Sequence, residues 1–199
     1  DNNISNLKKL RELYKKSNVN VMVNYFRRYQ PGFIELKEII KNSRLNKDNI
    51  SIVATYQKGV LNNGSHIIDL VEYLLNEKIN FTNLRKTNLF FDDCESDPTI
   101  SLQGEWLNRS LKIIGMNNIK FSFLDIKIFF EQFAILVEDN GNTIKYMKPN
   151  EKMGSHYPKL IIEQEKINVI ENYMINVINT AKLILGGQKN LCNFEESLD

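Results

Sequence analysis

Residues 79–148 constrain the fold more than any other part of the chain, because apolar and polar side chains alternate along most of their length. Such alternation is typical of strands that bury one face of a sheet, and a large sheet needs helices over that face. We therefore expect an α+β fold: a large, mostly antiparallel open sheet covered on one face by helices. The expected strands are 50–56, 79–91, 99–106, 111–115, 119–130, 134–139 and 143–148, with Asp139-Asn140-Gly141 as a tight hairpin turn.

Helical spacing of apolar residues predicts the covering helices, at 31–41, 64–76 and 166–185. Pro31 suits the first position of its helix, and Gly186-Gly187 is typical of a C-cap. Residues 57–63 are expected to form a loop.

The first residues are expected to belong to a different domain. Residues 4–17 have helical spacing, and Val19 to Val23 is short and mostly apolar, like a strand buried in a parallel sheet. We interpret residues 1–24 as the last helix–strand unit of a truncated doubly wound domain, and residues 25–199 as a second domain. The chain opens on Asp1 without an initiator Met, so we expect a piece of a longer protein.

Composition excludes several classes of function. A net charge of +2 gives little support to nucleic-acid binding, and no apolar run reaches the roughly 20 residues of a membrane span. Cys94 and Cys192 are too few for a disulfide framework, and with two isolated histidines they make no convincing zinc set. We expect no metal, and a cytoplasmic protein, since the N-terminus has no apolar signal segment. His156 is expected to be a surface residue.

The strongest candidate for chemistry is His66, in the first turn of the helix expected over 64–76. Asp69 and Tyr73 follow at helical spacing, so all three share a face. A histidine supported by a carboxylate suits proton transfer near neutral pH, and free N–H groups at the helix start could receive substrate oxygens. The alternative is structural: Asn63 or Ser65 caps the helix, and Asn-Asn-Gly is only a turn signal.

A second candidate group is Tyr25, Arg27, Arg28 and Tyr29, directly after the expected strand 19–23. In open α/β sheets, ligands bind beyond the carboxyl ends of strands, where an arginine can hydrogen-bond hydroxyl or phosphate groups. The alternative is that one arginine pairs with a carboxylate at the domain junction while the other is solvated. The chain contains no GxGxxG, P-loop, GxSxG or HExxH motif.

In this order and separation, the segments Asn24 to Ile40 and Asn62 to Leu75 resemble the family of glucose-fructose oxidoreductase, inositol dehydrogenase and the rhizopine-catabolism dehydrogenases. The resemblance implies an N-terminal Rossmann domain that binds the cofactor and a C-terminal domain whose sheet shapes the sugar site and often the oligomer interface. It also implies that this chain starts a few residues after the family's Glu-Lys-Pro segment.

Residue by residue, the resemblance places His66 on the catalytic histidine, which accepts the proton of the substrate hydroxyl. It places Arg27 in the sugar site and Asp69 on an acid that supports the helix and the imidazole ring. One departure is Asn62, where the family has Asp; Asn can still bind a sugar hydroxyl but can take no proton. We therefore expect substrate binding by Arg27 and Asn62.

The resemblance implies NAD or NADP in the full-length protein. Because this chain lacks the glycine-rich loop and the catalytic lysine, we expect no cofactor on it and no turnover by it alone. The function predicted first is the substrate-binding and oligomerisation domain of an oxidoreductase that acts on a sugar, sugar nucleotide or cyclitol. The alternative is a non-catalytic carbohydrate-binding or dimerisation module. Expected partners are the missing N-terminal domain and a second copy, with neither nucleic acid nor membrane.

Overall fold

The computed structural model describes residues 4–17, 19–42, 50–80, 83–90, 96–106, 109–116, 119–150, 158–190 and 192–195. The chain divides into two compact units. We call Pro31–Glu171 the sheet unit, and Asp1–Gln30 together with Asn172–Asp199 the flanking unit. The domain boundary expected after residue 24 stays a prediction.

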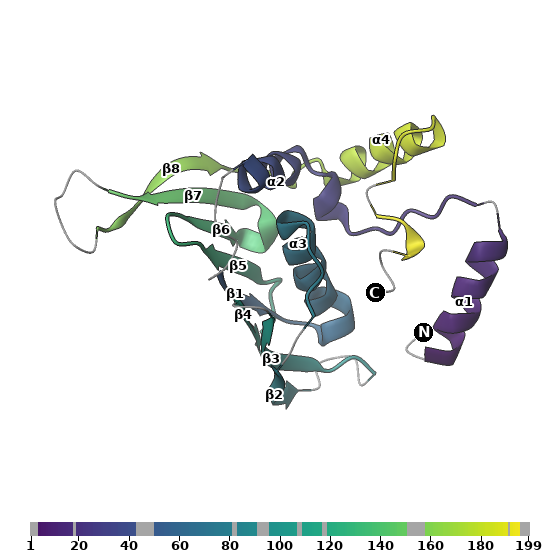
Figure 1. The fold of residues 1–199 in the computed structure, drawn as a ribbon, viewed down its shortest axis with the longest axis horizontal. Helices are drawn as coiled ribbons and strands as arrows, with labels where there is room; N and C mark the ends of the chain where they lie inside the picture. The colour runs from purple at the N-terminus through teal and green to yellow at the C-terminus, as the bar shows by residue number, and fades with distance from the viewer. Residues whose placement is uncertain are drawn as a thin grey trace. The chain divides into compact units, whose positions relative to one another are not determined.

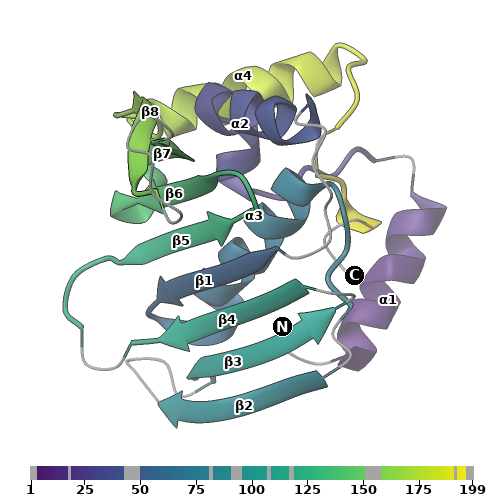
Figure 2. The ribbon, with the colours of Figure 1, turned by 60° about the vertical axis from the view of Figure 1, so that its left-hand side comes forward.

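The sheet unit is built on one eight-stranded sheet in the order β2-β3-β4-β1-β5-β6-β7-β8 (Figure 2). Its central strand β1 runs parallel to β4 and antiparallel to β5, and the other neighbours are antiparallel. The α+β fold with a mostly antiparallel open sheet is therefore confirmed. The strands are β1 (Ser51–Tyr56), β2 (Asn83–Phe90), β3 (Thr99–Trp106), β4 (Arg109–Gly115), β5 (Leu124–Phe129), β6 (Ala134–Glu138), β7 (Thr143–Pro149) and β8 (Leu160–Lys166).

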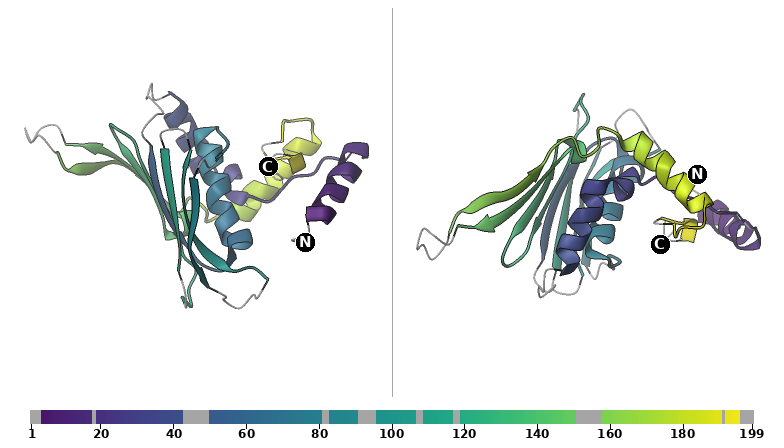
Figure 3. Two further views of the ribbon diagram at one scale, coloured as in Figure 1. Left: turned by 60° about the horizontal axis from the view of Figure 1, so that its bottom comes forward. Right: turned by 90° about the horizontal axis from the view of Figure 1, so that it is seen from above.

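Two helices, α2 (Pro31–Asn42) and α3 (Ser65–Leu75), lie on the same face of this sheet (Figures 1 and 3). Every second residue of β1, from Ile52 to Tyr56, is buried on that face. The helices contribute apolar residues spaced three or four apart, which bury one side of each helix. The core that results includes Phe33, Leu36, Ile40, Ile67, Leu70, Val71, Leu74, Leu111, Ile113, Ile126 and Ile128.

The opposite side of the sheet, which we call the open face, carries the alternate residues of the same strands. Lys127 and Phe129 of β5 are exposed there, between the buried residues that point toward the helices. Among the described residues of the sheet unit, no helix covers this face (Figure 3). The single covered face follows the expectation from sequence, but the helix expected over 166–185 was also predicted to cover it and instead belongs mostly to the flanking unit.

The strands expected from alternation are confirmed, with bounds that shift by up to five residues. The long helix expected over 166–185 is wrong in its first turns. Lys166 ends the strand β8 (Leu160–Lys166), which the sequence did not predict, and residues 167–172 lie in irregular and turn conformations before the helix α4 (Tyr173–Leu185). The Glu163 to Lys166 segment carries residues that also suit helices, and hydrogen bonding to β7 outweighs that local preference.

The expected turns are present. Asn140 and Gly141 have φ angles of 58° and 92°, which the tight connection between β6 and β7 requires. Gly187, with a φ of 97°, ends α4: its N–H donates to the carbonyl of Ile184 and that of Gln188 donates to the carbonyl of Leu183.

The flanking unit contains α1 (Ile4–Lys16), a 3₁₀ turn η1 (Phe26–Tyr29) and α4. The buried residues Tyr29, Val177 and Cys192 hold it together. The strand expected over 19–23 is wrong. Of residues 19–23, only Met22 forms a bridge within the described part of the chain, with Asn193, and a strand needs a partner along its whole length.

Candidate functional site

The helix that carries His66 begins earlier than expected. Residues 57–63 were expected to be a loop, but Gly59–Gly64 forms a π-helix that continues into α3. The N–H of Ser65 accordingly reaches back five residues to the carbonyl of Val60. Single π-turns inside helices occur often at functional sites.

The site face of α3 consists of His66, Asp69 and Tyr73, the three residues that helical spacing places together. His66 is half-buried, whereas Asp69 and Tyr73 are each 7% exposed. The ammonium group of Lys37, from α2, lies 4.2 Å from the centroid of the Tyr73 ring. The face therefore runs from a partly accessible imidazole to a buried aromatic ring that a cation covers. The roles of His66 and Asp69 stay predictions.

The backbone N–H groups at the start of this helix are all occupied by the segment that leads into β3. The N–H of Gly59 donates to Thr99 Oγ1 at 2.9 Å, and that of Val60 to the carbonyl of Pro98 at 3.0 Å. The carboxylate of Asp97 accepts the next two N–H groups, those of Leu61 and Asn62. The expectation that free N–H groups here receive substrate oxygens is therefore wrong, because the chain's own groups already satisfy them.

Asn62 is exposed on the π-helix, and its side-chain amide donates to the carbonyl of Lys58 at 3.2 Å. The alternative that Asn63 or Ser65 caps the helix is wrong, since both side chains donate to carbonyl groups. Asn63 Nδ2 lies 2.8 Å from the carbonyl oxygen of Gln57, and Ser65 Oγ lies 2.7 Å from that of Leu61. The substrate-binding role of Asn62 stays a prediction.

Arg27 lies in η1 of the flanking unit and is 6% exposed. Its guanidinium carbon lies 4.5 Å from the centroid of the Phe26 ring, which in turn packs against Tyr173 of α4 at 5.0 Å. The end of a parallel strand, at which Arg27 was expected, is absent from the described residues. Because Arg27 and His66 belong to different units, their joint action on a substrate stays a prediction.

Asp125 is a half-buried residue on the open face, with one of its carboxyl oxygens covered. Its Oδ1 atom has no hydrogen-bond partner among the described residues. Burial, and then the negative charge of Glu138 on the neighbouring strand β6, raise the pKa of Asp125 above its ordinary value of 3.8. Both effects disfavour the ionised form of the carboxyl group, which a nearby positive charge would instead stabilise.

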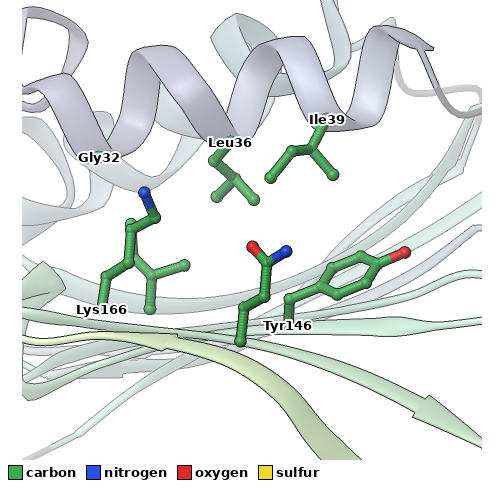
Figure 4. Close-up of a pocket in the computed structure, with 7 residues that line it drawn as sticks. Gly32, Leu36, Ile39, Tyr146 and Lys166 are labelled. Atoms are coloured by element: carbon green, nitrogen blue, oxygen red, sulfur yellow. The ribbon is translucent and has the colours of Figure 1, made fainter.

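A mostly apolar hollow lies between α2 and the strands β7 and β8 (Figure 4). Gly32, Leu36 and Ile39 form its helix side, while Tyr146 and Lys166 come from the strands. The Lys166 ammonium group also pairs with Glu35 of α2. We assign no ligand to this hollow.

Sequence reasoning missed Asp97 and Thr99, which cap the helix that bears the candidate site. The dipeptide Asp97-Pro98 is a turn signal, but nothing in the sequence indicates that the turn meets a helix more than 30 residues earlier. Within the described ranges, no three His, Cys, Asp or Glu side chains form a group that could hold a metal ion. Cys94 and His156 lie outside the described residues.

No helix in the described part of the structure is long and apolar enough to cross a membrane. No protein-family model matches the sequence, and comparison with curated proteins finds no match.

Solved structures, in contrast, match the chain over most of its length. A dehydrogenase (MviM) from Clostridium difficile is 18% identical with a TM-score of 0.66, and the match covers 99% of this chain and 64% of that one. An oxidoreductase from Agrobacterium radiobacter, in complex with NAD+, L-tartaric acid and magnesium, is 11% identical with a TM-score of 0.66 and the same coverage. A super-repressor mutant of Gal80p from Saccharomyces cerevisiae is 14% identical with a TM-score of 0.65, covering 89% and 54%.

This chain has the fold of these proteins. It spans between about half and two thirds of the length of each, 54% to 64%. The group contains both oxidoreductases and a regulator, so the fold by itself is compatible with either activity.

Proposed function

We propose that the chain is the substrate-binding and oligomerisation domain of an NAD(P)-dependent oxidoreductase that acts on a sugar, sugar nucleotide or cyclitol. The observation that carries this proposal is the site face of α3, where a half-buried His66 lies one helical turn before the buried Asp69. The oxidoreductases that share the fold support the same reading.

In this proposal, His66 accepts the proton of a substrate hydroxyl while hydride leaves the carbon that bears it. A neutral imidazole suits that step, since its ordinary pKa lies near physiological pH. Asp69 holds the helix and the ring in place. Arg27 and Asn62 hydrogen-bond other hydroxyl groups of the substrate, and thereby select for a polyhydroxylated ring.

The described residues do not form a dinucleotide site. The sequence has no glycine-rich phosphate loop, and the carboxylate of Asp97 occupies the helix start next to the candidate site, where it would repel a phosphate. A nicotinamide cofactor, bound by a separate domain, would take up the hydride, and this chain would supply the substrate site and the proton acceptor.

The partner in that arrangement is a dinucleotide-binding domain. The flanking unit supports it, because the helices α1 and α4 expose large apolar side chains. Leu13 is 64% exposed, Ile175 57% and Leu185 80%. Apolar surface of this kind marks a contact with another domain or chain.

The test joins this chain to the domain that we expect upstream of Asp1 in the parent gene. A panel of sugars, sugar nucleotides and cyclitols is offered with NAD+ or NADP+, and nicotinamide absorbance is followed. We expect His66→Ala to lower kcat by about 10²- to 10⁴-fold, the usual contribution of a general base. His156→Ala, which replaces the other histidine of the chain, is the matched control and should keep the activity.

Oxidation of a panel member that His66→Ala leaves unchanged would refute the role of His66. A failure to find any upstream GxGxxG and Glu-Lys-Pro, together with no turnover, would refute the dehydrogenase function.

The second candidate is a non-catalytic carbohydrate-binding or dimerisation module. Two observations favour it: Asn62 stands where an acid would be expected from the resemblance, and the regulator Gal80p shares the fold. Calorimetry would distinguish it, since such a module binds a sugar or a second copy without NAD(P)-dependent turnover.

A further inference from the structure

The carboxylate of Asp97 closes the N-terminus of the helix that carries the candidate site. Its Oδ1 atom accepts the N–H of Leu61 at 2.8 Å, and its Oδ2 atom accepts the N–H of Asn62 at 2.9 Å. One carboxylate thus holds two successive backbone groups, and one of them belongs to a candidate substrate-binding residue. A negative charge at this helix end is also favourable toward the helix dipole.

The backbone before the helix is shaped to receive this carboxylate. Lys58 and Gly59 both have a left-handed conformation, with φ angles of 63° and 83°. A Cβ atom on Gly59 would lie 2.1 Å from Asp97 Oδ2, so only glycine leaves room for the contact. The left-handed pair turns the chain at the end of β1 and directs the first N–H groups of the π-helix toward Asp97.

Asp97 is itself anchored. Two residues further on, Thr99 is fully buried and accepts the N–H of Gly59. The hydroxyl group of Tyr56, at the end of β1, lies 2.9 Å from the backbone nitrogen of Ile100 and 2.8 Å from its carbonyl oxygen. The start of β3 is therefore fixed to the sheet at the point where Asp97 contacts the helix.

We propose that Asp97 is a positioning residue for Asn62 and His66. Asp97 sets the residue at which the helix starts. Through the π-turn, it thereby sets the rotation of the helix about its axis, and with it the direction in which the side chains of Asn62 and His66 extend. This role rests on the proposed function, because it matters for chemistry only if those two residues bind and deprotonate a substrate. Asp97 touches no reacting atom and is not a catalytic residue.

The requirement for a carboxylate makes the role testable by graded substitution. Asp97→Ala removes both acceptor atoms, whereas Asp97→Asn keeps one acceptor oxygen and loses the charge. Asp97→Glu keeps the charge and both oxygens on a longer side chain. Glu163→Ala is the matched control, since it removes an exposed carboxylate that pairs with Lys148 at 2.9 Å on the edge strand β8.

The first readout is amide hydrogen exchange measured by NMR on the chain as it is, without cofactor. We expect Asp97→Ala to accelerate exchange at Leu61 and Asn62 by about tenfold or more, the population change that corresponds to one lost hydrogen bond. Amides in the middle of α3, such as those of Leu70 and Leu74, should keep their protection. Asp97→Asn should give an intermediate result, and Glu163→Ala none.

The second readout is the imidazole signal of His66, with His156 as an internal reference because the chain has two histidines. We expect Asp97→Ala to shift the signal of His66 and to leave that of His156 unchanged, with partial recovery in Asp97→Glu. The fluorescence of the single tryptophan shows whether each variant is folded.

Unchanged exchange at Leu61 and Asn62 in a folded Asp97→Ala chain would overturn the proposal, as would an unchanged His66 signal. Both readouts are independent of turnover. If no sugar is oxidised but the signals move as expected, the proposed function fails while the positioning of Asn62 and His66 by Asp97 is supported.

Discussion

Gly59→Ala is the substitution to which the candidate site should be most sensitive, although it removes no functional group. The added methyl group meets Asp97 Oδ2 at 2.1 Å, Asp97 Cγ at 2.3 Å and the Asp97 carbonyl oxygen at 2.9 Å. Because part of this contact is with backbone, rotation of the Asp97 side chain alone cannot relieve it. Alanine also has to adopt a φ angle of 83°.

The two costs can be estimated separately. A left-handed conformation costs alanine about 1 kcal/mol relative to glycine. Displacement of the Asp97 carboxylate removes a helix cap, which costs up to about 2 kcal/mol. We therefore expect Gly59→Ala to lower the free energy of unfolding of the sheet unit by about 3 kcal/mol, and its Tm by roughly 10 °C.

Urea unfolding followed by tryptophan fluorescence is the suitable assay, because the single tryptophan, Trp106, lies on β3 and reports on the sheet unit. In an Asp97→Ala background the carboxylate is gone but the contact with the carbonyl oxygen of residue 97 remains, so the cost of Gly59→Ala should fall by up to about 2 kcal/mol, which is the coupling between the two positions. Gly186→Ala is a control for the glycine-to-alanine change itself, in the flanking unit: its φ angle is −79°, the nearest atom lies 3.4 Å away, and its effect on stability should be small.

A loss of less than about 1 kcal/mol in Gly59→Ala would contradict the reasoning. Equal losses in the wild-type and Asp97→Ala backgrounds would also contradict it, because they would show that the carboxylate is not what the methyl group displaces.

Two further predictions concern the open face. The pKa of Asp125 is higher in the folded chain than in the unfolded chain, so its contribution to stability is present below about pH 4 and is lost as pH rises through the folded value. We expect Asp125→Asn to stabilise the chain at pH 7 by up to about 1 kcal/mol and to have little effect at pH 3. Urea unfolding at the two pH values tests this, and a larger stabilisation at pH 3 than at pH 7 would contradict it. We also propose that the open face pairs with a second copy of the chain, and we expect light scattering to give the mass of a dimer. Phe129→Lys on the open face should lower the affinity of the dimer at least about tenfold, whereas Ile34→Lys on the helix side should leave it unchanged. A monomer at tens of micromolar would contradict this.

Much of the sheet unit follows from the sequence because its signals are local. Alternation along β5 predicts both the strand and its buried face, and Pro31 with the apolar residues that follow it predicts α2. The spacing of His66, Asp69 and Tyr73 places them on one face of a helix whatever the helix packs against. These features depend on periods of two and 3.6 residues, which are properties of the chain itself.

Tertiary structure decided the features that depend on distant partners. The segment Leu160 to Lys166 pairs with β7 although its second half also suits a helix, and Val19 to Val23 forms no strand because one bridge from Met22 is its only described pairing. The start of the helix that carries His66 depends on a distant partner in the same way. Asp97 lies 38 residues after Gly59 in the sequence, and its carboxylate contacts the first turn of the helix and sets where the helix begins. Sequence determines which residues share a face, but it does not determine which distant group satisfies the end of a helix, because that contact exists only after the sheet has folded.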